Sequence, residues 1–183
     1  MDDPLINTLS GFNDVLNEHL QHMKMFHQHE VQVEGWLKGE LLVYFHHLQD
    51  NKAIHRFERE VILDNQRKKI DIRLEIRNTN PPDYYWIEIK HWLIGHQKGY
   101  KLNCNFYFTD PTSVGILPDV NKLSGIKADN KYLVILTTNN PGAEEWIQGI
   151  NKFNTKFGPL HIDAINSPAS FPQTHFLGVL KTI

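Results

Sequence analysis

Apolar residues at the start of the chain recur at the spacing of an amphipathic helix. From residue 5 to about residue 49 they follow an i, i+3, i+4 pattern, which predicts two helices. The His- and Gln-rich stretch 26–30 lies near their junction, and the polar triplet 50–52 marks a stop. We therefore expect a helical start to the chain, with about residues 1–30 forming an extension to the main fold.

Three segments with strand character follow these helices. Residues 60–63 are mainly apolar, residues 69–76 alternate between apolar and polar, and residues 84–92 are rich in aromatic and β-branched side chains. Short polar turns separate the three segments. This arrangement favours an antiparallel meander.

The second half of the chain adds helices and further strands. Pro118 begins a predicted helix that runs to about residue 126, and the apolar run 132–136 is typical of a buried parallel strand. A helix from about 143 to 156 and short strands near 161–165 and 175–181 complete the prediction. We expect one α/β (α+β) domain over residues 1–183, with a mixed central sheet flanked by helices.

Composition narrows the class of protein without identifying it. Hydrophobic residues make up 40% of the chain, which is typical of a globular protein, and no apolar run approaches the length of a membrane span. The acidic N-terminus lacks a signal-peptide pattern, so we expect a cytoplasmic protein with no membrane partner. Cys104 is the only cysteine, which excludes an internal disulfide and predicts a reduced core thiol.

The formal charge of −2 excludes a strong positive field over the whole protein. Any contact with nucleic acid must therefore be local, and a solvated surface explains each basic cluster equally well. The candidate clusters are Arg67-Lys68-Lys69, Lys98 with Lys101, and the scattered Lys122, Lys127 and Lys131.

Charged residues on two neighbouring predicted strands stand out from this background. In residues 70–76 the period of two places the apolar side chains on one face and Asp71, Arg73 and Glu75 on the other. The same rule places Glu88 beside Lys90 in a strand otherwise suited to burial. If the two strands pair as a meander, Asp71 lies beside Glu88, and two adjacent carboxylates favour a shared cation.

This pattern predicts a magnesium site. Mg²⁺ takes hard oxygen ligands, commonly one or two carboxylates together with water and substrate phosphate oxygens. Such an ion lowers the pKa of a bound water and neutralises charge on a phosphate, and Mn²⁺ can substitute for it. Lys90 on the same face would orient the water or stabilise the charged transition state.

With these residues, the stretch from about Glu34 to Thr138 resembles the PD-(D/E)XK nuclease superfamily, which has a restriction-endonuclease-like fold. The resemblance implies a core of helix, three-strand meander, helix and parallel strand. It assigns catalytic roles to Asp71 and to the acid-x-Lys triplet 88–90, with the backbone carbonyl of Ile89 as a further metal ligand. It also implies a glutamate from the preceding helix, for which Glu40 is the preferred match and Glu34 the alternative.

The chain contains three acid-x-Lys triplets, and their sequence context favours the one at 88–90. Those at 50–52 and 129–131 lie in polar turns, whereas Glu88 and Lys90 lie inside an apolar strand that follows an acid-bearing strand. Ile70 stands where the superfamily motif has proline. A salt-bridged, solvent-facing sheet surface is the competing interpretation of these charges, and Glu75 is expected at the surface.

The sequence thus predicts a metal-dependent endonuclease that hydrolyses phosphodiester bonds in DNA, with RNA as an open alternative. The rival prediction is a catalytically inactive module of the same fold that binds nucleic acid or other proteins. Double-strand cleavage would require a homodimer, and the apolar stripe of residues 5–25 is a candidate surface for it. Histidine-based metal binding is not favoured, because the histidine spacings fit no zinc pattern, and His91 is expected to pack away from Glu88.

Overall fold

The computed structural model describes residues 3–29, 31, 33–63, 68–92, 115–137, 148, 151–152, 154–155, 161–165 and 176–182. Within these residues the fold is mixed α/β. Its helices are α1 (Pro4–Glu18), α2 (Leu20–Gln28), α3 (Glu34–Asp50) and α5 (Ile116–Ser124). Its strands are β1 (Arg56–Ile62), β2 (Lys69–Glu75), β3 (Tyr84–Trp92), β4 (Lys131–Thr137), β5 (His161–Ile165) and β6 (Phe176–Thr182).

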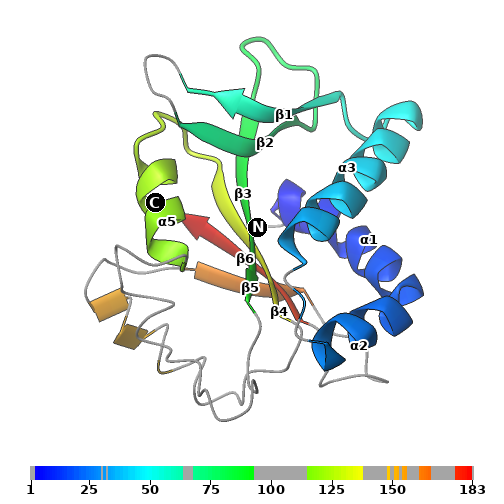
Figure 1. Ribbon diagram of the computed structural model, residues 1–183. Coiled ribbons are helices and arrows are strands. Elements are labelled where there is room, and N and C mark those ends of the chain that lie inside the picture. The colour runs from blue at the N-terminus through cyan, green and yellow to red at the C-terminus, as the bar shows by residue number, and fades with distance from the viewer. Residues whose placement is uncertain are drawn as a thin grey trace.

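The described strands form one mixed sheet in the order β1-β2-β3-β4-β6-β5. The first three strands pair as an antiparallel meander, and β4 pairs with β3 in parallel, as the sequence predicts. Figure 1 shows α1, α2 and α3 on one side of this sheet and α5 on the other. The charged residues of β3 therefore lie between two helical layers.

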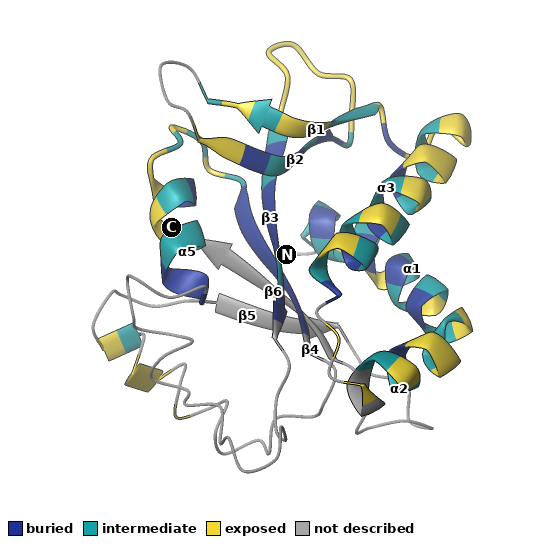
Figure 2. Cartoon of the chain, in the orientation of Figure 1, coloured by how far each residue is buried: buried dark blue, intermediate teal, exposed yellow. Residues whose placement is uncertain are grey.

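One apolar cluster joins the three N-terminal helices to the sheet. In α1 and α3 the residues that point into this cluster are three or four positions apart, because that spacing returns to the same face of a helix. Its fully buried members include Leu5, Leu9, Phe12 and Leu16 of α1, Leu37, Leu41 and Phe45 of α3, and Ile72, Ile87 and Tyr132 of the sheet. In Figure 2 the buried colour runs along the middle of β3 and β4.

This packing changes two expectations about the N-terminal region. The apolar stripe expected as a dimer surface is instead buried within the chain, because α1 uses it to pack in the common core. The region expected as an extension, about residues 1–30, thus contributes side chains to the common core. The predicted pair of helices is also wrong in number, since α1 ends at Glu18 and the cap residue His19 (φ −100°) separates it from α2.

The start of α1 is held by a side chain as well as by packing. Asp3 accepts hydrogen bonds from the backbone N–H of Leu5 (2.9 Å) and of Ile6 (3.4 Å), and Pro4 occupies the first turn, where its missing N–H costs nothing. A cap of this kind contributes about 1 kcal/mol. The other oxygen of Asp3 accepts from the Tyr132 hydroxyl on β4 (2.7 Å), so the helix start is tied to the central sheet.

Most predicted strands agree with the structure to within a residue or two. The main difference is β1, which begins at Arg56 because its ladder with β2 extends to the pair Arg56 and Glu75. Residues 93–114, which include Cys104, and most of the predicted helix 143–156 lie outside the described residues. Among the described residues, no helix has the length and apolar character needed to cross a bilayer.

Candidate active site

Strands β2 and β3 separate at the position of Asp71. Their regular pairing runs from Glu75 and Tyr84 to Ile72 and Ile87, so the next step places Asp71 opposite Glu88. There the side chains replace the backbone ladder: Ile89 N–H donates to Asp71 Oδ2 (2.9 Å), and Asp71 N–H donates to Glu88 Oε1 (3.3 Å). The structure thus brings the two predicted carboxylates together at the split between the strands.

The same position is irregular on the other side of β2. The pairing of β1 with β2 runs on both sides of Glu60 but leaves out the step that would join Glu60 to Asp71. Glu60 has φ +50°, in the left-handed region that L side chains rarely adopt. Backbone strain of this kind costs about 1 kcal/mol or more and gathers at functional sites. Asp71 is therefore the centre of a local distortion that involves three strands.

On one side, Asp71 is contacted by a lysine from α3. Lys38 Nζ lies 2.9 Å from Asp71 Oδ1 and 3.0 Å from Glu34 Oε1, one helical turn earlier on the same face of α3. Burial alone would lower the pKa of Lys38, but its hydrogen bonds and charge interactions with Asp71 and Glu34 raise it overall. Lys38 is therefore held as a cation between two carboxylates.

Helix α5 supplies the partners of Glu88 and Lys90. Lys122 Nζ lies 2.6 Å from Glu88 Oε2 and 3.6 Å from Asp119 Oδ1, while Lys90 Nζ lies 2.8 Å from Asp119 Oδ2. The apolar face of α5 packs on the sheet, with Leu123 fully buried, which fixes the position of these charged groups. Lys90 is therefore brought to the same group as Glu88, as the sequence predicts.

Together these residues form an ionic group of four carboxylates and three ammonium groups. The members are Glu34, Asp71, Glu88 and Asp119, with Lys38, Lys90 and Lys122. Glu88 is the most deeply placed of the acids, with 3% of its side chain exposed. When all seven groups are ionised, the net charge of the ionic group is −1, and an additional positive charge would neutralise it.

Burial sets the protonation of Glu88. Desolvation and the nearby charge of Asp71 raise the pKa of Glu88 to about 8, although the Lys122 ammonium acts in the opposite direction. The acid consequently holds a proton near neutral pH unless another cation is supplied. Raised carboxyl pKa values of this kind are common at catalytic and metal-binding positions.

The donor set suits a hard divalent cation. Asp71 and Glu88 offer neighbouring carboxylate oxygens, and the backbone of Ile89 lies beside Asp71, to which its N–H donates. Among the described residues, no group of three or more His, Cys, Asp or Glu side chains is arranged to hold a metal. A magnesium ion at this site would therefore take two carboxylates, with its remaining ligands from the backbone, water or substrate.

Glu40, the preferred helix acid, lies elsewhere. Its Oε2 is 3.5 Å from His19 Nε2, at the junction of α1 and α2. Glu40 comes two positions after Lys38, which is about 200° around the helix, so the two side chains point to different sides. The helix acid near Asp71 is Glu34, which reaches it through Lys38.

Two other predicted positions are clarified by the structure. Glu75, expected at the surface, is 1% exposed because Arg56 Nε donates to its Oε2 at 2.6 Å. His91 points away from the ionic group, as expected. It is buried on the α3 side, accepts from Val33 N–H (3.5 Å), and has its pKa lowered to about 4 by desolvation.

Sequence reasoning did not assign three members of the ionic group to the site, although Lys122 was considered as a scattered basic residue. Lys38 is one turn from Glu34, and Asp119 and Lys122 stand three residues apart in a predicted helix. These spacings are a weak signal, because charged residues at such intervals are common on exposed helices. Only the packing of α3 and α5 on opposite sides of the sheet brings them to Asp71 and Glu88.

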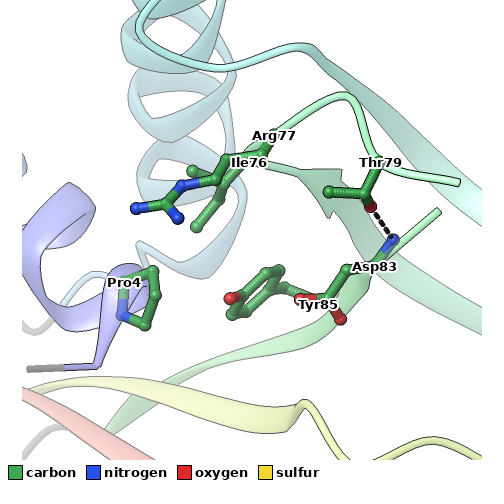
Figure 3. A pocket seen from close by; sticks show the side chains of 6 residues that line it. All are labelled: Pro4, Ile76, Arg77, Thr79, Asp83 and Tyr85. Atoms are coloured by element: carbon green, nitrogen blue, oxygen red, sulfur yellow. Dashed lines mark hydrogen bonds between the residues drawn. The ribbon is translucent and has the colours of Figure 1, made fainter. Parts of the chain in front are cut away.

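A separate hollow lies away from this group, near the start of α1. It has a volume of about 190 Å³ and is lined by Pro4, Ile76, Arg77, Thr79, Asp83 and Tyr85. Figure 3 shows these side chains around the opening, with Asp83 N–H donating to Thr79 Oγ1 at 3.1 Å. None of the seven charged residues of the ionic group lines it.

The chain was compared with protein families, curated proteins and solved structures. No family model, curated protein or solved structure matches the chain. The fold and the candidate site define a mixed α/β protein with an acid pair where β2 and β3 separate, in which Glu88 is buried and Asp71 is partly exposed.

Proposed function

We propose that this protein is a metal-dependent nuclease that hydrolyses phosphodiester bonds in DNA. The observation that carries the proposal is the meeting of Asp71 and Glu88 at the split between β2 and β3. The order of helix α3, a three-strand meander, α5 and the parallel strand β4 supports a restriction-endonuclease-like core of the PD-(D/E)XK type. Lys90 supports the assignment, because it contacts Asp119, which also neighbours the Lys122 that pairs with Glu88.

In this proposal Asp71, Glu88 and the Ile89 carbonyl hold Mg²⁺ or Mn²⁺. The ion supplies an activated water and charge neutralisation when it is bound. Lys90 places a positive charge beside the attacked phosphate and stabilises the negative charge that develops there. Asp119 orients Lys90, and the ammonium groups of Lys38 and Lys122 hold the carboxylates in place.

The test is cleavage of plasmid and oligonucleotide DNA by the purified protein with Mg²⁺ or Mn²⁺. We expect E88Q, D71N and K90A each to lower the cleavage rate by about 100-fold or more, since each removes a group at the reacting phosphate. E40Q is the matched control, because Glu40 lies with His19, and its rate should stay within about twofold of the parent. Activity that survives E88Q and K90A would refute the site.

An inactive module is the second candidate, and one observation favours it. Both acids already have a lysine counter-ion, at 2.9 Å for Asp71 and 2.6 Å for Glu88, so the ionic group could serve the fold alone. In that case neither metal ion should bind to the parent protein. Titration calorimetry with Mn²⁺ separates the two candidates, since the nuclease requires heat of binding that E88Q abolishes.

A further inference from the structure

A row of arginine and aromatic side chains continues from the acid pair along the same face of the sheet. Two residues along each strand from Asp71 and Glu88, Arg73 pairs with Trp86, and two residues further on Glu75 pairs with Tyr84. Because alternate residues of a strand share a face, both steps lie on the side that carries the acid pair. We call Arg56, Arg73, Tyr84 and Trp86 the arginine–aromatic ladder.

The members of the ladder are in close contact with one another. The Arg73 guanidinium carbon lies 4.6 Å from the ring centre of Tyr84 and 5.3 Å from that of Trp86. The two rings meet edge to face, with centres 6.3 Å apart, and Arg56 lies 5.6 Å from the Tyr84 ring. Planar groups with π faces are thus assembled into one surface.

This surface is open rather than sealed in the core. Helix α5 packs against β3, β4 and β6, which leaves the β1 and β2 end of this face to the ladder. Side chains of Arg56 and Arg73 are 44% and 24% exposed, and Tyr84 and Trp86 are half-buried. The ladder therefore offers planar side chains that are partly exposed to solvent.

Charge distinguishes the ladder from the neighbouring ionic group. Each arginine is neutralised by its own carboxylate: Arg56 pairs with Glu75 at 2.6 Å, and Arg73 pairs with Glu58 at 2.7 Å. A neutral, planar surface attracts a base more than a phosphate, because stacking does not require net charge. The lysines beside the acid pair are better suited to the phosphate.

We propose that the ladder stacks an unpaired nucleobase of the strand that is cut, which makes the substrate single-stranded DNA or DNA with an unpaired nucleotide at the cut. This inference rests on the proposed nuclease function. Alternate residues of a strand are about 7 Å apart, so Trp86 lies within reach of the base next to a phosphate held at Glu88. In duplex DNA both faces of each base are covered by stacking, and only an unpaired base offers a free face.

The test measures binding without cleavage, in the E88Q background and with EDTA. A fluorescent single-stranded oligonucleotide and its duplex are titrated with E88Q, E88Q/W86A, E88Q/W86F and E88Q/R73K, and binding is followed by anisotropy. We expect W86A to weaken single-strand binding about 5- to 100-fold, the effect of losing one stacked base, with little change for the duplex. W86F should retain most of the affinity, and R73K, which keeps the charge but not the planar group, should lose part of it.

E88Q/W36A is the matched control, since Trp36 is also half-buried but packs against Phe26 and His19 among the helices. Its single-strand affinity should remain within about twofold of E88Q. Circular dichroism verifies that each variant is folded, and if W86A unfolds, R73K and W86F decide the question. Equal binding of single strand and duplex, or loss in W86A no greater than in W36A, would overturn the inference.

Failure of the nuclease proposal would be visible separately. If the parent protein cleaves no DNA while E88Q still binds single strands through Trp86, the stacking proposal is supported and the nuclease proposal is refuted. If the parent cleaves duplex DNA better than single strands, the ladder assignment falls and the nuclease proposal stands.

Discussion

At residue 88, burial opposes the ionisation of a carboxyl group. Glu88 is almost fully buried next to Asp71, and its pKa is raised to about 8. An unfolded chain would ionise the same group near pH 4.5. The unfolded state therefore binds fewer protons than the folded state between these pH values, so stability falls as pH rises from about 4.5 to 8.

Replacement of Glu88 by glutamine should remove this penalty. At pH 7 we expect E88Q to raise the free energy of unfolding by about 1 to 3 kcal/mol, because glutamine stays neutral in the same shape. At pH 5 the difference in free energy of unfolding between E88Q and the parent should be below about 1 kcal/mol, because Glu88 is then mostly protonated in the folded state and only partly ionised in the unfolded state. Urea unfolding at the two pH values measures it. A variant less stable than the parent at pH 7 would mean that the contact with Lys122 outweighs the cost of burial.

Some residues of the site could be predicted from the sequence, and others could not. Asp71 and Glu88 were accessible because the period of two in each strand and the meander order fix which residues face each other. Glu34 could not be separated from Glu40, because α3 carries apolar residues around most of its circumference: Leu37 and Phe45 are buried, while Trp36 and Leu42 are partly so. Burial of Glu75 depends on Arg56, a partner 19 residues away.

At the scale of elements, close packing of α1 on α3 depends on a glycine. A Cβ atom added at Gly11 would lie 2.5 Å from the Tyr44 hydroxyl, which donates to Thr8 O (2.7 Å). Sequence patterns predicted the helical character of this region, but glycine inside a helix carries no sign of the partner that approaches it. The contact is a property of two elements together.

G11A should therefore be destabilising despite the better helix propensity of alanine. We expect a loss of about 1 kcal/mol, since displacement of Tyr44 outweighs the propensity gain of about 0.5 to 1 kcal/mol. G39A is the control: a Cβ there meets no atom within 4 Å, and this variant should be neutral or more stable. Thermal unfolding of G11A, Y44F and the double variant tests the cause, because Y44F removes the clashing oxygen. Equal losses in G11A with and without Y44F would contradict it.

Over the whole molecule, the site is assembled from parts far apart in the sequence. Helix α3 supplies Lys38, β2 and β3 supply the acids, and α5 supplies Lys122 from the other side of the sheet. Sequence patterns predicted the order of these elements and the parallel pairing of β4. They could not predict the lysine partners, because these contacts exist only after both helical layers have packed on the sheet.

If the proposed metal ion binds at this site, it should stabilise the entire fold. A ligand that binds only the folded state adds about 2.7 kcal/mol at 100 times its dissociation constant. We expect Mg²⁺ or Mn²⁺ to raise the Tm of the parent and of E40Q in a concentration-dependent manner, and EDTA to reverse the rise. Differential scanning calorimetry should show no such shift in D71N. An equal shift in D71N and the parent would place the ion away from Asp71.

The side-chain bridge at the strand split provides a local reporter of the site. The Ile89 amide is held by the Asp71 carboxylate, and the Asp71 amide by the Glu88 carboxylate. Deuterium uptake at these two amides therefore depends on side-chain placement, while uptake at neighbouring amides depends on opening of the sheet. Comparing the two exchange rates would show movement of either acid in solution, even when the fold as a whole stays closed.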